Sequence, residues 1–233
     1  MRQKFGLSGT ALKWLALITM TIDHIGAFLL TWKSAWYIPL RLIGRFAFPV
    51  YCMLLVEGDH YSRDRRRYAL RLLIFALLSE IPYNLAHGSL WYPKGQNVFF
   101  TLFLGELLLI LIREIRERSE DTVIQSLGIL LLAIGFMVIA EIAGVDYGMG
   151  GILAVFMLGV LRPWNMKSIA AIALCMALCW HSYWVQTLAA LAFPIAFLLY
   201  NGRRGSAGPL SKYAFYAYYP LHLLIIGMIA AAR

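Results

Sequence analysis

The sequence carries few charged residues. Asp, Glu, Lys and Arg make up 14% of the 233 residues, and Asp and Glu contribute only 12 of them. Soluble domains average about 25% charged and about 45–50% apolar residues, whereas this chain is 61% hydrophobic with a mean hydropathy of +0.70. This composition excludes a soluble enzyme and a disordered chain.

Cysteine is also scarce. Cys52, Cys175 and Cys179 are the three cysteines, and each falls in an apolar stretch. An odd number of cysteines without accompanying His or Asp pairs argues against a disulfide framework and against a metal site. The sequence also lacks a low-complexity linker, a long-period repeat and the small-residue cleavage site that would predict a removable signal peptide.

Apolar segments fill most of the chain. A helix needs about 20 mostly apolar residues to cross about 30 Å of hydrocarbon. We predict an all-α, polytopic transmembrane helix bundle of about nine spans, in which residues 1–233 form a single integral membrane domain. Eight spans are the alternative, because the sixth to eighth segments are short enough for a re-entrant or tilted element. The predicted spans cover residues 11–31, 35–57, 69–86, 97–112, 122–141, 145–161, 168–183, 185–200 and 213–231.

The 21 Lys and Arg residues predict the orientation of these spans. Lys and Arg accumulate in short cytoplasmic loops, and here they cluster in every second connection, which places the N-terminus in the cytoplasm. The opposite connections hold only Lys33, Lys94 and Arg233. The formal charge of +9 is therefore mainly a topology signal, and we expect no nucleic-acid partner. The cations on the predicted cytoplasmic side are Arg2, Lys4, Lys13, Arg63, Arg65, Arg66, Arg67, Arg113, Arg116, Arg118, Arg162, Lys167, Arg203, Arg204 and Lys212.

Three arginines lie inside predicted spans: Arg41, Arg45 and Arg71. A charge at the centre of a membrane helix costs about 2.5–3.5 kcal/mol, so it normally faces a partner or a watery cavity. Arg41 and Arg45 are spaced i, i+4, so both guanidiniums project from one helix face and together suit a phosphate or a carboxylate. Gly44 and Pro49 loosen the helix beside them and favour space for a ligand. The alternative is that both arginines reach the outer headgroups.

Asp23 and His24 lie in the outer half of the first predicted span. A histidine suits general base catalysis, because its ordinary pKa lies near neutral pH. Adjacent helical residues point about 100° apart, so we do not expect Asp23 to bond its neighbour's ring directly. It acts on His24 through space or pairs with an arginine. The structural alternative is an Asp23 ion pair with Arg41 or Arg45, and a His24 that only contacts a neighbouring helix.

Further polar residues complete the candidate site. Glu80, Asn97, Asp146 and Tyr147 lie at the same outer level as Asp23. An ion pair between Glu80 and Arg45 is the structural alternative for Glu80. On the inner side we single out Glu57 and Arg71, with His222 deeper in the last span. The basic cytoplasmic residues either bind lipid headgroups or meet the phosphates of a cytosolic donor.

A series of short motifs carries a family resemblance over nearly the whole chain, in order. They are Met20–Gly26, Arg41–Pro49, Val56–Gly58, Tyr68–Arg71, Ser79–Tyr83, Asn97–Thr101, Asp146–Gly148 and Phe215–His222. Together they resemble the TraX family of membrane acetyltransferases, whose named member acetylates the N-terminus of conjugative F pilin.

The resemblance implies an acetyltransferase of the bacterial inner membrane that uses acetyl-CoA as donor and no metal. It implies His24 as general base or transient acyl carrier, with Asp23 as its electrostatic partner. Arg41 and Arg45 would hold a phosphate, a pantetheine carbonyl or an acceptor carboxylate. The remaining residues implied for substrate and CoA binding are Glu57, Arg71, Glu80, Asn97, Asp146, Tyr147 and His222.

The expected partners are membrane lipids, acyl-CoA and an acceptor whose amine or hydroxyl belongs to a protein N-terminus, a lipid or a glycan. We expect the donor to enter from the basic cytoplasmic face and to thread its pantetheine arm through the bundle toward His24. A membrane transporter is the main rival function, because buried Asp, His, Arg and Glu also build proton and substrate pathways. A binding or assembly protein with structural ion pairs is the third.

Overall fold

The computed structural model describes residues 6–180, 184–205 and 208–232, and over these residues the fold is all-α, as predicted. Two isolated backbone bridges, Leu7 with Tyr200 and Gln96 with Val145, are the extended pairings. Arg2, Lys4 and Arg233, which contribute to the predicted topology, lie outside the described residues. The helices are α1 (Gly9–Leu29), α2 (Tyr37–Gly44), α3 (Ala47–Tyr61), α4 (Arg65–Ala86), α5 (Val98–Arg118), α6 (Thr122–Ile142), α7 (Gly148–Val160), α8 (Met166–Cys179), α9 (Trp184–Ala189), α10 (Ala192–Leu199) and α11 (Pro209–Ala231).

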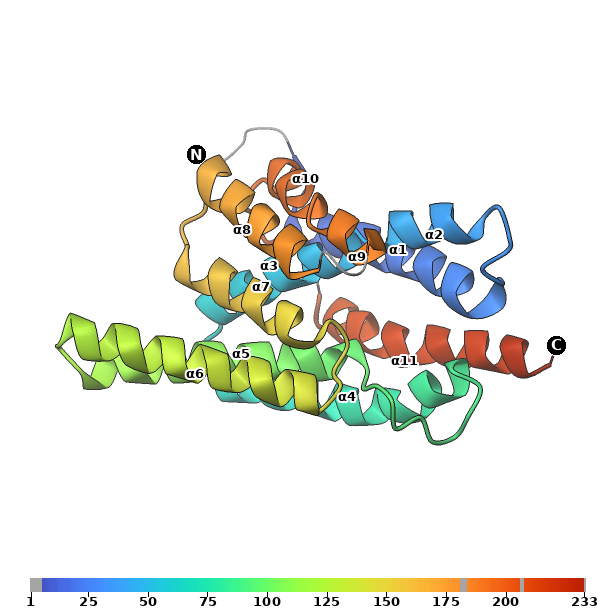
Figure 1. Cartoon of the computed structure of the whole chain (residues 1–233), viewed down its shortest axis with the longest axis horizontal. Helices are drawn as coiled ribbons and strands as arrows, with labels where there is room; N and C mark the ends of the chain where they lie inside the picture. The colour runs from blue at the N-terminus through green and yellow to red at the C-terminus, as the bar shows by residue number, and fades with distance from the viewer. Residues whose placement is uncertain (1–5, 181–183, 206–207, 233) are drawn as a thin grey trace.

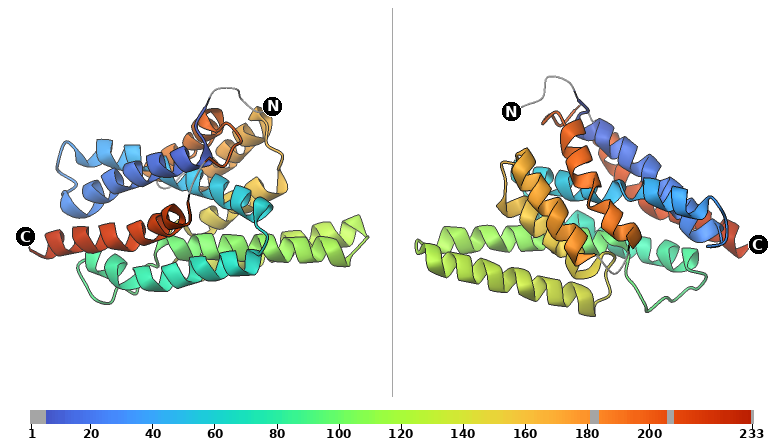
Figure 2. Two further views of the ribbon diagram at one scale, coloured as in Figure 1. Left: turned by 180° about the vertical axis from the view of Figure 1, so that it is seen from behind. Right: turned by 45° about the horizontal axis from the view of Figure 1, so that its top comes forward.

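Successive segments run alternately between two ends of the molecule (Figure 1). We call one the basic end, formed by the start of α1 and the connections 62–64, 119–121, 161–165 and 200–205. The other is the cavity end, formed by the connections 30–36, 87–97 and 143–147. α11 packs against both α1 and α4 and lies between them (Figure 2). This placement brings the last helix against the first.

The second predicted span is interrupted. Residues 35–57 do not form one helix: α2 ends at Gly44 and α3 begins at Ala47. At the break, the amide of Arg45 donates to the carbonyl of Leu42 and that of Phe46 to Ile43, which is the tighter i−3 pattern. Pro49, which has no N–H, follows in the first turn of α3, where helices tolerate proline. The interruption places Arg45 at the corner between the two helices.

The span count of about nine is not confirmed. Among the described residues, five segments are long and apolar enough to cross a membrane: Gly9–Leu29, Tyr37–Tyr61, Arg65–Ala86, Thr122–Ile142 and Tyr213–Ala231. α5 has 21 residues, but it carries Glu106 at its centre and a charged last turn. The sixth and seventh predicted spans are helices of 13 and 14 residues, about 20 Å long. The eighth is divided between α9 and α10, so these three segments are shorter than a full crossing.

The outer faces of the long helices are apolar. α6 is the clearest case, because large hydrophobic side chains are exposed along its whole length. Together with the five long apolar helices, such faces indicate a membrane protein, because a lipid environment satisfies them. The exposed residues of α6 are Val123, Ile124, Leu127, Leu130, Leu131, Ile134, Val138, Ile139 and Ile142.

Candidate functional site

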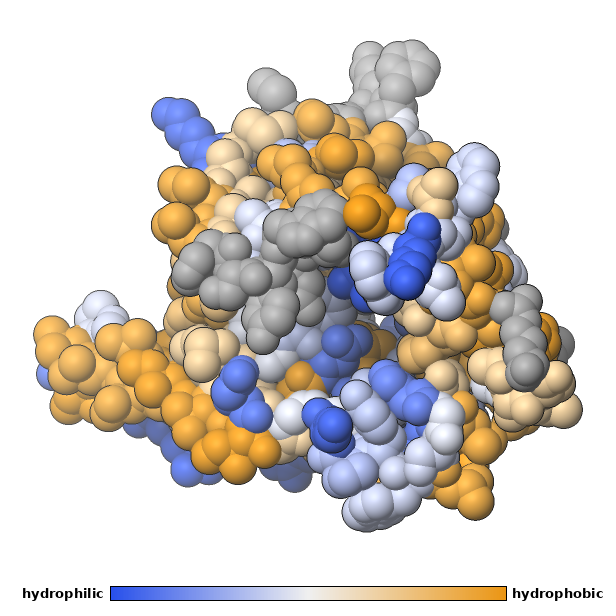
Figure 3. All heavy atoms as spheres, turned by 45° about the vertical axis from the view of Figure 1, so that its right-hand side comes forward, coloured by the Kyte–Doolittle hydropathy of each residue, from blue (hydrophilic) through white to orange (hydrophobic). Residues whose placement is uncertain are grey.

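A cavity of about 1040 Å³ opens at the cavity end of the bundle. Its walls come from α1, α2, α3, the end of α4, the connection between α6 and α7, and α11. The space-filling view shows the molecule hollowed there, with hydrophilic residues around the hollow and apolar residues on the flanks (Figure 3). Six of the residues singled out in the sequence line it: Asp23, His24, Arg41, Arg45, Asp146 and Tyr147.

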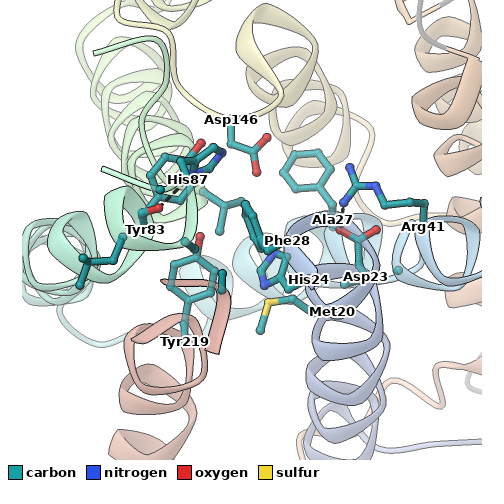
Figure 4. Close-up of a pocket in the computed structure, with 18 of the residues that line it drawn as sticks. Met20, Asp23, His24, Ala27, Phe28, Arg41, Tyr83, His87, Asp146 and Tyr219 are labelled. Carbon is teal, nitrogen blue, oxygen red and sulfur yellow. Dashed lines mark hydrogen bonds and ion pairs between the residues drawn. The ribbon is translucent and has the colours of Figure 1, made fainter. Parts of the chain in front are cut away.

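Asp23 binds both arginines of the Arg41–Arg45 pair. Its carboxylate accepts from Nη1 of Arg41 at 2.6 Å and from Nη2 of Arg45 at 2.8 and 2.7 Å. The two guanidiniums reach one carboxylate because they leave the same helix face one turn apart. These three side chains together carry a net positive charge, and the carboxylate of Asp146 faces them across the cavity (Figure 4). Arg45 is buried, whereas the side chain of Arg41 is 23% exposed, so Arg41 is the guanidinium that a ligand can reach.

These bonds confirm one of the structural alternatives, the ion pair of Asp23 with the arginines, and contradict another. Arg45 does not pair with Glu80, because it pairs with Asp23. The carboxylate of Asp23 forms hydrogen bonds with the two arginines, whereas the ring of His24 forms a hydrogen bond with a different residue. Nδ1 of His24 lies 2.6 Å from Nε2 of His222 on α11. Any effect of Asp23 on His24 therefore acts through space.

Asp146 and Tyr147 enter the cavity from the connection between α6 and α7. Asp146 points into the space opposite Arg41 (Figure 4), and its Oδ1 accepts from the amide of Tyr147 at 3.0 Å. Tyr147 has a φ of 65°, a left-handed conformation that costs a non-glycine residue about 1–3 kcal/mol. Its ring stacks on Phe48 with centroids 3.6 Å apart, and the guanidinium of Arg45 lies 5.8 Å from the ring centre. These contacts hold the connection against the arginines.

An aromatic group at the cavity mouth was not predicted from the sequence. His87, the residue that ends α4, packs its ring on Tyr92 and Tyr83 at centroid distances of 4.2 and 4.4 Å. Phe28 of α1 meets it edge-on at 4.9 Å. Burial lowers the pKa of His87 below its ordinary value. The sequence offers one signal for His87. It follows Glu80 by two helical turns on the same helix, and Glu80 itself is expected at the same outer level as Asp23.

Five other predicted site residues lie outside the cavity wall. Asn97 donates to Glu80 at 2.8 Å and to the carbonyl of Ala76 at 2.9 Å, and so ties α5 to α4. Glu57 lies at the basic end and accepts from Arg162 at 3.0 Å and from the hydroxyl of Tyr200 at 2.9 Å. The predicted residues that do not line the large cavity are Glu57, Arg71, Glu80, Asn97 and His222.

A narrow apolar slot of about 80 Å³ lies next to the cavity, on the side toward the basic end. It shares Met20, Tyr51, Val98 and Tyr219 with the cavity. Its other lining residues include Lys13, near the start of α1, and Tyr68 and Tyr216. The guanidinium of Arg71 lies 5.6 Å from the ring centre of Tyr68. Arg71 therefore stands beside the slot at its inner part.

The described part of the chain contains no assembled set of metal ligands. There, no group of three or more His, Cys, Asp or Glu side chains is placed to hold an ion. The charged groups of the cavity instead suit an organic ligand with anionic or polar groups, because guanidiniums, a carboxylate and imidazoles bind such ligands directly.

The fold and the cavity define a polytopic helical membrane protein with two histidines, an arginine pair and two carboxylates in one cavity. The chain belongs to the TraX family, because residues 8–230 match the family described as TraX protein. It is similar to the probable fimbrial assembly protein FimC, serogroup H1, of Dichelobacter nodosus, with 26% identity over 250 aligned residues that cover 97% of each chain. An uncharacterized protein of Rickettsia prowazekii (strain Madrid E) is 29% identical over 97 residues, which are 41% of this chain and 34% of that protein. No solved structure matches the chain.

Proposed function

We propose that this protein is a membrane-embedded acetyltransferase that moves an acetyl group from acetyl-CoA to an amine or hydroxyl of an acceptor bound at the cavity end. The observation that carries the proposal is the position of His24. Its ring lines a charged cavity of about 1040 Å³, and its Nδ1 is already bonded to His222, so that Nε2 is left for a substrate. The TraX membership supports the proposal. The name of the Dichelobacter nodosus relative supports an acceptor connected with fimbriae.

The proposed reaction needs one base and one oxyanion donor. Nε2 of His24 takes the proton of the acceptor amine or hydroxyl as that group attacks the thioester carbonyl. Arg41 stabilises the oxyanion. Among the described residues, its guanidinium donates only through Nη1, to Asp23, so its other N–H groups are left for the substrate. The carbon–sulfur bond then breaks, and the leaving thiolate takes the proton from His24. The products are the acetylated acceptor and CoA with a free thiol, so atoms and charge balance.

The slot supports an entry route for the donor. A pantetheine arm is thin and largely apolar along its sides, and the slot is narrow, apolar and shares four lining residues with the cavity. Lys13 and Arg71 lie toward the basic end, where cations favour the phosphates of CoA. The donor therefore enters from the basic end, which we assign to the cytoplasm from the charge of its connections.

The position of Asp146 indicates which kind of acetyl acceptor the cavity favours. Its carboxylate faces the cavity opposite Arg41 and bonds its own chain through the amide of Tyr147. A carboxylate at this position favours an acceptor that arrives as an ammonium group. One of its protons passes to Asp146 and from there to solvent, and a second passes to His24 during the attack on the thioester. An amine, such as a protein N-terminus, fits this wall better than a hydroxyl.

Transfer of label from acetyl-CoA tests the proposal. The purified protein is incubated in detergent micelles with radiolabelled acetyl-CoA and envelope material, and labelled product is measured. His24→Ala is expected to lower the rate by about 100-fold or more, the usual share of a general base. His60→Ala is the matched control, because His60 is exposed at the basic end of α3 and lies outside the cavity. A His24→Ala protein that folds and transfers acetyl at the wild-type rate overturns the assignment.

A transporter is the second candidate function. The observation that favours it is that the cavity and the slot lie next to each other, since together they extend from the cavity end toward the basic end. Proteoliposomes distinguish the two functions. Solute or proton flux without consumption of acetyl-CoA supports transport, whereas release of free CoA thiol without flux supports the enzyme.

A further inference from the structure

We propose that His222 is a positioning residue that fixes the tautomer of His24, so that the lone pair of His24 faces the cavity. The inference deepens the proposed function, on which it rests for its catalytic meaning. It starts from two short contacts. Nδ1 of His222 lies 2.9 Å from the carbonyl oxygen of Tyr218, and Nε2 of His222 lies 2.6 Å from Nδ1 of His24.

The positions of the protons follow from these contacts one at a time. A carbonyl oxygen can only accept, so Nδ1 of His222 must carry a hydrogen and donate it to Tyr218. A neutral imidazole has one N–H, so Nε2 of His222 carries a lone pair. The contact to His24 is then a hydrogen bond only if Nδ1 of His24 is the donor. Nε2 of His24 is therefore the unprotonated nitrogen, as a general base requires.

The ring geometry agrees with a hydrogen bond rather than with stacking. The two imidazole planes lie within 4° of each other, and their centroids are 4.9 Å apart. With the facing nitrogens at 2.6 Å, the rings lie nearly in one plane and meet edge to edge. His24 lines the cavity and His222 does not, so the pair points from the interior of the bundle toward the substrate space.

Aromatic neighbours restrain both rings. Tyr219 meets His222 edge-on at 5.4 Å and His24 at 6.1 Å, and Phe28 lies 5.6 Å from His24. The hydroxyl of Tyr218 lies 2.7 Å from that of Thr21, which joins α11 to α1 beside the pair. These contacts oppose the ring flip that would exchange the two nitrogens of His24.

A neutral hydrogen-bond acceptor for His24 suits this depth in the membrane. In soluble enzymes a carboxylate often orients the catalytic histidine, but a further buried charge is costly in a bilayer. His222 supplies the same acceptor geometry without a formal charge. When His24 takes a proton on Nε2, its Nδ1–H bond to His222 stays in place and stabilises the imidazolium, so the ring does not reorient between the two halves of the reaction.

Nitrogen-15 NMR of the histidine-labelled protein in micelles tests the tautomer directly. The His24 signals are identified by their loss in His24→Ala. We expect His24 with its hydrogen on Nδ1 in the wild type, and a mixture or the opposite tautomer in His222→Phe, which keeps a ring but removes the acceptor. His222→Gln is expected to restore the wild-type tautomer, because its amide oxygen can replace Nε2. His60→Phe is the matched control: it makes the same substitution at an exposed histidine of the basic end, outside the pair, and is expected to leave the tautomer unchanged.

Kinetics give the second readout. His222→Phe is expected to lower kcat by about 10- to 100-fold with an unchanged KM for acetyl-CoA, and His222→Gln to recover most of that loss. A wild-type His24 that carries its hydrogen on Nε2 overturns the inference, as does a His222→Phe protein with wild-type tautomer and kcat. If the wild type transfers no acetyl group, the proposed function fails, while the NMR result still decides the tautomer.

Discussion

Gly44 of α2 lies against Asp23 of α1 with no room for a side chain. A β-carbon at position 44 would be 2.0 Å from Cβ of Asp23 and 2.5 Å from its Cγ. This approach brings the two helices together between Arg41 and Arg45, which flank the glycine. Both guanidiniums reach the same carboxylate because the backbone of Gly44 lies directly against the side chain of Asp23.

Gly44→Ala is therefore expected to destabilise the protein. The added methyl group must push α2 away from α1, and overpacking of this kind costs about 1–3 kcal/mol. Thermal unfolding in detergent micelles is expected to show a lower Tm. Gly135→Ala on α6 is the matched control, because a β-carbon there meets nothing within 4 Å. Equal Tm values for Gly44→Ala and the wild type contradict the role of the close approach.

Asp23→Asn is expected to lower the free energy of unfolding by about 3–5 kcal/mol, since it leaves Arg45 buried without its counter-ion. A double-mutant cycle with Arg45→Gln checks the cause, because the loss for the pair should be smaller than the sum of the single losses. Asp64→Asn serves as the control. It weakens the exposed ion pair with Arg67 and should change the free energy of unfolding by about 1 kcal/mol at most. Additive losses at Asp23 and Arg45 would show that the pair is not coupled.

Arg71→Gln is expected to raise the KM for acetyl-CoA by about tenfold with little change in kcat, because it removes a cation beside the proposed donor slot. Arg67→Gln is the matched control on the same helix. Its side chain is 80% exposed and pairs with Asp64, away from the slot. Steady-state kinetics with varied acetyl-CoA measure both. A KM that rises equally in the two variants would assign the effect to general surface charge.

The orientation is tested by cysteine labelling in intact cells. We expect Lys94→Cys to react with a membrane-impermeant maleimide from outside, and Arg66→Cys to react only after the membrane is opened. The two positions lie at opposite ends of the bundle: Lys94 is in the 87–97 connection, and Arg66 is in the first turn of α4 (Figure 1). The unsubstituted protein, with its three native cysteines, supplies the background. Reversed accessibility would place the basic end outside.

Depth in the bundle is predictable from the sequence. Apolar runs locate a residue along the membrane normal, and they place Asp23, Arg41 and Asp146 at one level. The i, i+4 spacing of Arg41 and Arg45 predicts a shared face, and both line the cavity with Asp23. The presence of the helices also follows from composition, since the nine apolar segments correspond to single helices or to the pairs α2–α3 and α9–α10, although their ends differ by up to six residues.

The rotation of each helix about its axis, and so the neighbour that each side chain faces, is not predictable in the same way. Glu80 and Asn97 have the expected depth, yet they face each other between α4 and α5. The bond between His24 and His222 depends on the rotation and register of α11 against α1, which tertiary packing sets and no local pattern encodes. The short lengths of α7 and α8 also leave the number of full crossings open, because an apolar segment of that length suits several placements.

The histidine pair joins the beginning of the chain to its end. His24 belongs to α1, and His222 belongs to α11, which the ribosome synthesises after the other ten described helices. The proposed base acquires its orienting partner only when α11 has inserted and docked between α1 and α4. In the proposed enzyme, a nascent or truncated chain that lacks α11 would therefore hold an unoriented histidine, so acetyl transfer would report that synthesis and membrane assembly are complete.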